Sequence, residues 1–391
     1  MNKFSTRKLN ELGCDFLSGF AFKSSDYSGS GIPLIKIGNI QNKTVQIIPN
    51  GNYIDEELLN DKTEDYLLSN KDILIAMTGQ GSVGRVGKLK LDKNEKALLN
   101  QRVGKFICDE VNLNIDYLYY ILITDKYQDY LFNTGAGSGQ PNLSPELILQ
   151  TEIPWVEYSE QKEIASVLIS LDDKIDLLHR QNKTLESMAE TIFRQWFIEE
   201  AHEEWNIGVI PDEFEYTMGQ SPPGGSFNDD GLGIPMYQGN ADFGFRFPGV
   251  RIFTTDAKRL ANKFDTLISV RAPVGAQNMA KDKCCIGRGV AAFRYKINYE
   301  YYTYTYYKLR SLMREMEQFN NEGTVFGSIS KTNFESFEIT LPPTDLIDEF
   351  QKEVKPIDNK VIQNCFQIET LESLRDTLLP KLISGEVRVK H

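Results

Sequence analysis

The chain repeats itself with a period of nearly half its length. Thr-Leu-Glu-Ser occupies positions 184–187 and returns at 370–373, 186 positions further along in a chain of 391 residues. The match continues at the same offset, because Leu-Asp-Asp-Lys-Ile at 171–175 aligns with Ile-Asp-Asn-Lys-Val at 357–361. A period of this length predicts two duplicated halves, each ending in a helix.

Both copies lie inside long stretches in which apolar residues alternate at spacings of four and three. This spacing is typical of the buried seam between two paired helices. The predicted seam residues are Leu168, Leu171, Ile175, Leu178, Leu185 and Ile192 in the first stretch, and Ile357, Val361, Ile368, Leu371 and Leu378 in the second. Asn182 and Asn364 interrupt the two patterns.

The order of the segments constrains how these helices pair. The first helix carries the chain into the second half and the second leads away again, so we predict an antiparallel coiled coil. Pro356 should confine the regular part of the second helix to about residue 356 onward, and Pro380 should kink or stop it.

The segments before the helices alternate short β-like runs with Gly, Asn and Pro turns, and the second echoes the first, as Ile234-Pro235 echoes Ile32-Pro33. We therefore predict an α/β (α+β) fold with a pseudo-two-fold internal repeat. It has two similar globular domains at 1–157 and 201–343, a spacer helix at 158–200, and a second spacer helix with the C-terminal tail at 344–391.

Composition excludes several classes of protein. The chain has no apolar run of the roughly 18 residues that a membrane span needs, and its start lacks the apolar segment of a secretory signal, so we expect a cytoplasmic protein without a membrane partner. Its five cysteines form no CxxC pair and its three histidines are far apart, which argues against a zinc site or a disulfide framework.

A net charge of -12 argues at first against a nucleic-acid partner. The charge is unevenly distributed, however. Residues 246–314 hold fourteen Lys and Arg against four acids, and residues 71–105 hold eight against three. Each half thus carries a basic block, for which ordinary solvated surface remains the alternative interpretation.

One glycine motif suggests a dinucleotide site. Gly79–Gly84 has the GxGxxG pattern and follows a strand-like run at 72–77. A dinucleotide site requires a helix to begin there. Residues 85–91 look instead like a further strand, so we predict a tight hairpin.

Other segments do not complete a catalytic set either. Ser221-Pro222-Pro223-Gly224 lacks the stacking aromatic residue of the methyltransferase loop that it suggests, and no S-adenosylmethionine-binding glycine loop accompanies it. Glu353-Val354-Lys355 lies in a heptad pattern, and the tyrosine-rich run 299–307 is typical of a helix that packs on its own sheet. We therefore expect no catalysis by this chain, no metal ligands and no bound cofactor.

The remaining polar side chains in the basic blocks are candidate DNA contacts. Arg can bond guanine bidentately, Gln or Asn can bond adenine, and Lys can position the backbone. The candidates are Gln80, Ser82, Arg85, Lys88, Gln101, Arg102 and Lys105 in the first domain, and Gln238, Asn240, Arg246, Arg251, Arg271 and Arg288 in the second.

Several motifs together resemble the DNA-specificity subunits of type I restriction-modification systems, over essentially the whole chain. They include Glu-Gln-Lys-Glu-Ile at 160–164, Phe-Arg-Gln-Trp-Phe at 193–197, Tyr-Gln-Gly-Asn-Ala-Asp-Phe-Gly at 237–244 and Leu-Pro-Lys-Leu-Ile-Ser-Gly-Glu at 379–386. The resemblance implies two target-recognition domains that read a split, asymmetric site in double-stranded DNA, with the helices as the spacer between them.

The resemblance also implies partners. Two modification subunits would supply S-adenosylmethionine and adenine-N6 methyl transfer, and restriction subunits would supply ATP- and Mg-dependent translocation and cleavage. Two alternatives remain open: a stand-alone DNA methyltransferase or nuclease with an unrecognised site, and a coiled-coil scaffold that does not touch DNA.

Overall fold

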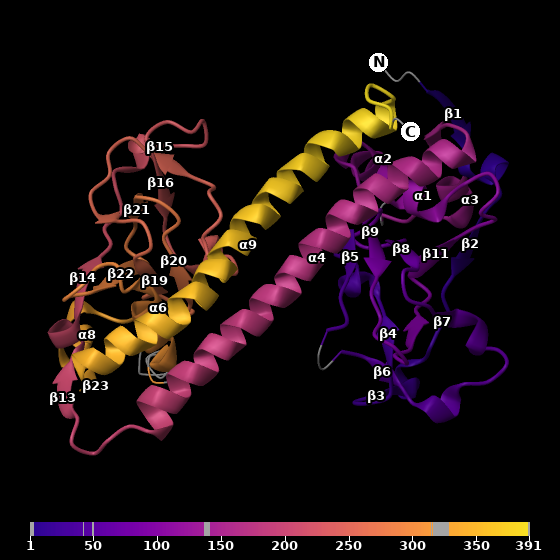
Figure 1. Cartoon of the computed structure of the whole chain (residues 1–391). Coiled ribbons are helices and arrows are strands. Elements are labelled where there is room, and N and C mark those ends of the chain that lie inside the picture. Colours follow the sequence, from indigo (N-terminus) through magenta and orange to yellow (C-terminus); the bar gives the residue numbers. More distant parts are fainter. Residues whose placement is uncertain are drawn as a thin grey trace. The chain divides into compact units, whose positions relative to one another are not determined.

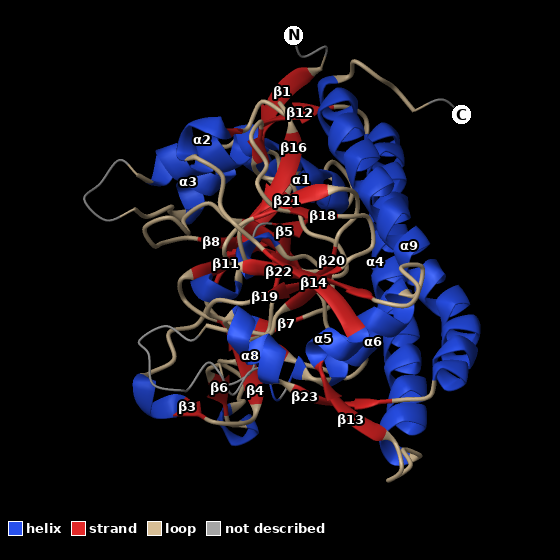
Figure 2. Cartoon of the chain, turned by 90° about the vertical axis from the view of Figure 1, so that its left-hand side faces the viewer, coloured by secondary structure: helices blue, strands red, loops and turns tan. Residues whose placement is uncertain are grey.

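The computed structural model describes residues 4–41, 43–48, 51–136, 141–313, 315 and 328–389. The chain forms two compact units, one made of residues 1–174 and 371–391 and the other of residues 175–370. Each unit holds one globular domain and one end of each of two long helices (Figure 1). Both domains mix short strands with short helices (Figure 2).

Two five-stranded sheets form the first domain. One has the order β2 (Cys14–Ser18), β11 (Val103–Cys108), β8 (Ile73–Ala76), β9 (Val86–Leu89) and β5 (Lys43–Val45). The other has the order β3 (Tyr27–Ser28), β6 (Tyr53–Ile54), β4 (Ile32–Ile35), β10 (Ala97–Leu99) and β7 (Leu67–Leu68). β1 (Ser5–Lys8) pairs with β12 (Glu152–Trp155), and the α-helices are α1 (Ile115–Leu122), α2 (Asp125–Gly135) and α3 (Pro145–Leu149).

The second domain repeats this plan. Its first sheet has the order β14 (Phe214–Met218), β22 (Val290–Tyr295), β19 (Thr266–Ser269) and β20 (Gln277–Met279). Its second has the order β15 (Phe227–Asn228), β17 (Phe253–Thr254), β16 (Ile234–Tyr237), β21 (Cys284–Ile286) and β18 (Leu260–Ala261). β13 (Asn206–Val209) pairs with β23 (Glu338–Leu341), and the α-helices are α5 (Ile210–Glu213), α6 (Tyr302–Ser311) and α8 (Lys331–Ser336).

The two long helices are α4 (Tyr158–Arg194), which ends in a π-turn at Gln195–Glu199, and α9 (Thr344–Ser384). They pack together in each unit and run antiparallel there. In the first unit Arg388 bonds Glu160 and Arg375 bonds Asp172, so positions rise along α4 as they fall along the C-terminal segment. In the second unit Asn364 bonds Asn182.

Each end of the helix pair completes the core of one domain. In the first unit Ile164, Leu168 and Leu382 belong to the same buried cluster as helix α1 and strand β8. In the second, Phe193 and Phe350 pack with the buried tyrosines of α6. The predicted seam residues are all buried or partly buried. Apolar burial of this kind provides most of the stability of long amphipathic helices.

The predictions that the regular helix begins only at about Pro356 and that it can stop at Pro380 were wrong, whereas a kink at Pro380 stays a prediction. Helix α9 runs through both Pro356 and Pro380 without a break. Both prolines are exposed. Because proline has no N–H, the carbonyls four residues earlier, of Lys352 and Asp376, lose their helical hydrogen-bond donor. Lys352 and Asp376 are also exposed. These carbonyls lie on the solvent side, where water can bond them, while the opposite face buries Val354 and Leu382.

None of the helices in the described ranges is both long and apolar enough to cross a membrane.

Candidate nucleic-acid interface

In the first domain, candidate residues gather at one end of the sheet that contains β8, β9 and β11. β8 ends at Ala76, opposite Val103 where β11 begins, and the loop 77–85 connects β8 to β9. The Met77 N–H donates to the Arg102 carbonyl over 2.9 Å, which ties this loop to the turn 100–102. Gln80, Gln101 and Arg102 are exposed on these connections, whereas Ser82 and Arg85 are half-buried.

The GxGxxG segment forms the hairpin that the sequence predicted. β8 and β9 are antiparallel neighbours, and Gly79, Gly81 and Gly84 all have positive φ values (105°, 74° and 84°), which glycine adopts without strain. At Gly84 a Cβ would also lie within 3.0 Å of α2. The hairpin is therefore shaped by glycine geometry and starts no helix that could bind a dinucleotide.

The second domain gathers its candidates at the same end of its own sheet. β19 ends at Ser269, which pairs with Val290 at the start of β22. Arg271 follows β19 and Arg288 precedes β22, and both are exposed. Gln238, also exposed, and the half-buried Asn240 follow β16, whose last residue accepts a hydrogen bond from the Gly287 N–H. Two arginines and two amides thus meet at one surface.

The turns before β11 and β22 share two equivalent backbone hydrogen bonds. Val103 N–H donates to Asn100 and Val290 N–H to Gly287, over 2.8 and 3.0 Å. The residue that follows the neighbouring strand donates an equivalent bond in each domain: the Gly19 N–H, after β2, donates to the Val103 carbonyl, and the Gly219 N–H, after β14, donates to the Val290 carbonyl. The turn 100–102 is therefore equivalent to the turn 287–289.

This equivalence places Gln101 in the first domain where Arg288 stands in the second. A Cβ at Gly19 would lie 2.3 Å from the carbonyl oxygen of Asn100, and one at Gly219 would lie 2.1 Å from that of Gly287. Both turns are thus packed too tightly against a glycine to shift. The equivalent turns present an amide in one domain and a guanidinium in the other, although the Gln101 N–H donates to the Phe20 carbonyl and the Arg288 N–H to the Ser221 hydroxyl.

Four of the predicted DNA contacts form ion pairs within their own unit. Lys88 lies 2.7 Å from Asp116 with its ammonium over the ring of Tyr119, and Lys105 lies 2.8 Å from Asp72. Arg251 pairs with Asp242, although its side chain remains 60% exposed. The fourth residue, Arg246, is enclosed by the helix pair.

Arg246 is 1% exposed, so it cannot reach a ligand in solution and the hypothesis that it contacts DNA is dropped. Its guanidinium lies 2.7 Å from Asp358 of α9 and 3.0 Å from Glu186 of α4, and it stacks 3.9 Å from the ring centre of Tyr306. Arg246 therefore fixes the second domain to its end of the helix pair.

Electrostatics keep this arginine charged. Burial by itself lowers the pKa of Arg246, but the negative charges beginning with Asp358 raise it well above its usual value. Burial raises the pKa of Glu186, opposed by Arg246 and Arg310. A buried charge of this kind is tolerated only when it is paired and hydrogen-bonded.

The segments considered for catalysis have other roles. Ser221 accepts a hydrogen bond from the Arg288 side chain over 3.4 Å, and Glu353–Lys355 lie within α9. The tyrosine run forms α6 and buries Tyr304 and Tyr306, as the packing interpretation predicted. Among the residues that the structure describes, no group of three or more His, Cys, Asp or Glu could hold a metal ion.

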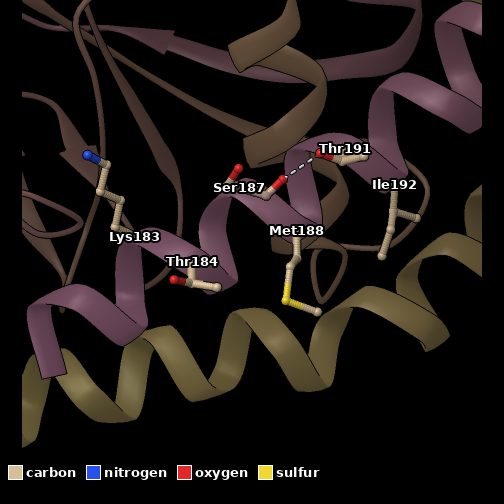
Figure 3. Close-up of a pocket in the computed structure, with 6 residues that line it drawn as sticks. All are labelled: Lys183, Thr184, Ser187, Met188, Thr191 and Ile192. Carbon is tan, nitrogen blue, oxygen red and sulfur yellow. Dashed lines mark hydrogen bonds between the residues drawn. The ribbon is translucent and has the colours of Figure 1, made fainter. Parts of the chain in front are cut away.

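Two surface depressions accompany these elements. One, of about 670 Å³, is lined by Gln41, Arg85, Asp125, Gln128 and Asp129 beside the first hairpin. The other, of about 550 Å³, lies on α4 between Lys183 and Ile192 (Figure 3). Met188 extends into it and is 49% exposed, and Thr191 donates to the Ser187 carbonyl over 2.8 Å. Neither depression has the grouped acid, base and nucleophile of a catalytic site.

Sequence reasoning missed one pair of positioning residues. The Gln161 side chain accepts from the Asn114 N–H at the start of α1, and Gln351 accepts from the Tyr304 N–H in α6. Both lie in Gln-Lys-Glu tripeptides, but 190 rather than 186 residues apart. A search that allowed a one-turn shift in the repeat would have found them.

Comparison with known proteins agrees with this architecture. The profile described as "Type I restriction modification DNA specificity domain" matches residues 1–187 and 202–371, once per half. The MjaX type I restriction enzyme specificity subunit of Methanocaldococcus jannaschii is 28% identical, over 92% of this chain and 88% of its own. The HindI specificity subunit of Haemophilus influenzae is 21% identical, over 72% and 80%.

The fold also has a solved counterpart. The crystal structure of a type I restriction-modification S subunit from M. genitalium matches with a TM-score of 0.64 at 17% identity, covering 98% of this chain and 96% of that one. The predicted fold class, two similar α/β domains with two long packed helices, is confirmed.

Proposed function

The chain belongs to the type I restriction-modification DNA specificity family and is therefore a non-catalytic specificity subunit that recognises a DNA target, and we propose how it does so. Each domain reads one part of a split, asymmetric site in double-stranded DNA. The reading residues lie at the end of the sheet that contains β8 in the first domain and at the end of the sheet that contains β19 in the second. The paired helices α4 and α9 set the gap between the two parts.

The exposed side chains at these sheet ends support the proposal. They are Gln80, Gln101 and Arg102 in the first domain and Gln238, Arg271 and Arg288 in the second, joined by the half-buried Ser82, Arg85 and Asn240. Arginine and amide side chains are the groups that distinguish guanine from adenine in the major groove. The placement of Gln101 and Arg288 on two equivalent turns suits two domains that read different sequences.

Chemistry on the DNA belongs to partners in this proposal. Two modification subunits bind S-adenosylmethionine and methylate adenine, and restriction subunits use ATP and Mg²⁺ to translocate and cleave. The depression on α4 that Met188 and Ile192 line offers these partners a surface outside the two reading ends.

Binding measurements on the full chain test the reading surface. We expect Arg271→Ala and Arg288→Ala each to weaken DNA binding by about 1–3 kcal/mol if they contact bases, or to reduce the salt slope by about one if they contact phosphate. Fluorescence anisotropy with a duplex carrying the target, at several salt concentrations, measures both.

A matched control removes the same charge from the other end of the same strand. Lys296 follows β22 at the end opposite Arg288, is exposed and donates to the Pro211 carbonyl. Lys296→Ala should leave binding nearly unchanged. Equal effects of all three substitutions would show only a general effect of charge. DNA binding that is absent, or that does not depend on salt, would favour the alternative that the chain is a coiled-coil scaffold that does not touch DNA.

A further inference from the structure

The middle of the second unit's helix pair contains a buried polar layer. Asn182 of α4 and Asn364 of α9, here called the Asn layer, are both 0% exposed, and the Asn364 amide donates to the Asn182 oxygen over 2.9 Å. The Asn182 amide in turn donates to the sulfur of Cys365 over 3.4 Å. The amide groups of both asparagines therefore bond to the other helix, whereas the side-chain oxygen of Asn364 is buried without a partner.

The internal repeat does not preserve this layer. At the offset of 186, Asn182 corresponds to Ile368 and Asn364 corresponds to Leu178. Leu178 and Ile368 are buried, and because they lie one turn from the asparagines in an antiparallel pair, they come opposite each other as an apolar layer. The pseudo-two-fold operation therefore exchanges a polar layer with an apolar one.

This asymmetry matters because the two helices are otherwise alike. Their shared seam would also allow α4 to pair with α4 of a second copy, and α9 with α9, in the same antiparallel register. In such pairing of like helices, Asn182 comes opposite Leu178 and Asn364 opposite Ile368. Every asparagine is then buried against an apolar side chain, which costs its unsatisfied hydrogen bonds.

An ion pair in the first unit has the same effect. Asp172 of α4 accepts from Arg375 of α9 over 2.8 Å and from Tyr120 over 2.6 Å. The repeat position of Arg375 is Ala189. If α4 paired with a second α4, Ala189 would take the place of Arg375 and Asp172 would lose its cation.

We propose that the Asn layer directs α4 and α9 to pair with each other within one chain, and disfavours pairing of like helices between two copies. A single buried asparagine pair is a known means of specifying register and partner in coiled coils. The inference does not depend on DNA recognition.

Three full-length variants test it. The all-apolar variant replaces each asparagine by its repeat counterpart, Asn182→Ile with Asn364→Leu. The all-asparagine variant makes the opposite change, Leu178→Asn with Ile368→Asn. In both, pairing of like and unlike helices presents identical layers. The moved-layer variant combines all four substitutions, so that again only unlike helices match Asn with Asn.

Each protein is unfolded in denaturant, refolded at one concentration and examined by sedimentation equilibrium. We expect the all-apolar and all-asparagine variants to show a dimer-to-monomer ratio about tenfold or more above that of the wild-type chain. The moved-layer variant should match the wild type, because it restores the asymmetry with the same number of asparagines.

The proposal is overturned if the folded all-apolar or all-asparagine variant dimerises no more than the wild type, or if the moved-layer variant dimerises as much as they do. The two symmetrised variants change core polarity in opposite directions, so a folding defect in one leaves the other to decide.

Discussion

The guanidinium of Arg246 holds one carboxylate from each long helix, and its removal tests how the second domain is fixed. Arg246→Ala leaves Glu186 and Asp358 buried without their shared cation. We expect a loss of about 3–5 kcal/mol in the free energy of unfolding of the second unit, the range for breaking one side of a buried ion pair. Denaturant unfolding of the full chain, followed by hydrogen exchange to locate the change, measures it.

Lys258→Ala is the control, because this lysine belongs to the same domain and pairs with Asp256 at the surface, where the two side chains are 40% and 47% exposed. Its loss should cost about 1 kcal/mol or less. Equal losses for the two substitutions would contradict the fixing role of Arg246.

The equivalent turns make a prediction about sequence preference. Gln101 suits an A·T pair and Arg288 suits a G·C pair, and each good bidentate contact is worth about 1–3 kcal/mol of discrimination. We expect Gln101→Arg to shift one position of one half-site toward G·C, and Arg288→Gln to shift one position of the other half-site toward A·T. Selection from a randomised DNA library with the full chain measures both shifts.

Each substitution should leave the other half-site unaltered, which serves as an internal control. If the library binds with a defined wild-type preference and neither variant changes it, these turns do not read bases, although the chain still recognises DNA.

At the scale of the elements, the prolines of α9 carry a measurable cost. Pro356 lies in the second unit and Pro380 in the first, both exposed within a continuous helix. A proline inside a helix costs about 3 kcal/mol relative to alanine, less where the freed carbonyl is hydrated. We expect Pro356→Ala to slow amide exchange in the second unit and Pro380→Ala to slow it in the first.

Faster exchange in the substituted unit would show that α9 depends on its prolines, and an equal effect on both units would show that the cost is not local. The unaffected unit is the control for each variant.

The same elements show how far the sequence predicts the fold. The repeat and the four-three spacing predicted both long helices and their pairing with each other, because burial of a seam depends on the pattern of apolar residues. The break at Pro356 was predicted wrongly, since local propensity was overridden by burial of Phe350 and Val354 on the other face.

The candidate site was predicted less completely. Residue types in the basic blocks identified Arg271 and Arg288 as exposed candidates, but could not separate them from Arg246, whose burial depends on carboxylates 60 and 112 positions away in the chain. Likewise Lys88 and Lys105 are engaged by Asp116 and Asp72 through tertiary contacts that no local pattern records.

At the scale of the whole molecule, the helix pair should act as a spacer. Both helices pass from one compact unit to the other at Lys174–Ile175 and Thr370–Leu371. Inserting one seven-residue repeat at each of these points keeps the seam in phase and leaves both units intact. Each insertion adds about 10 Å of helix, equal to about three base pairs.

We therefore expect the double insertion to keep both half-sites and lengthen the preferred gap by about three base pairs. Binding should weaken as well, because the added base pairs turn one half-site about the DNA axis. Insertion into α4 alone is the control, and it should disrupt the helix pair. An unchanged gap in the double insertion would refute the spacer role.

The most direct measurement is a map of methylated adenines in the host genome, obtained by single-molecule sequencing with this gene present, deleted, or replaced by the Arg288→Gln form. We predict a split, asymmetric methylated motif that disappears on deletion, and whose one half changes at a single position in the variant while the other half and the gap stay the same. A methylation pattern that is unaltered by deletion would contradict the account.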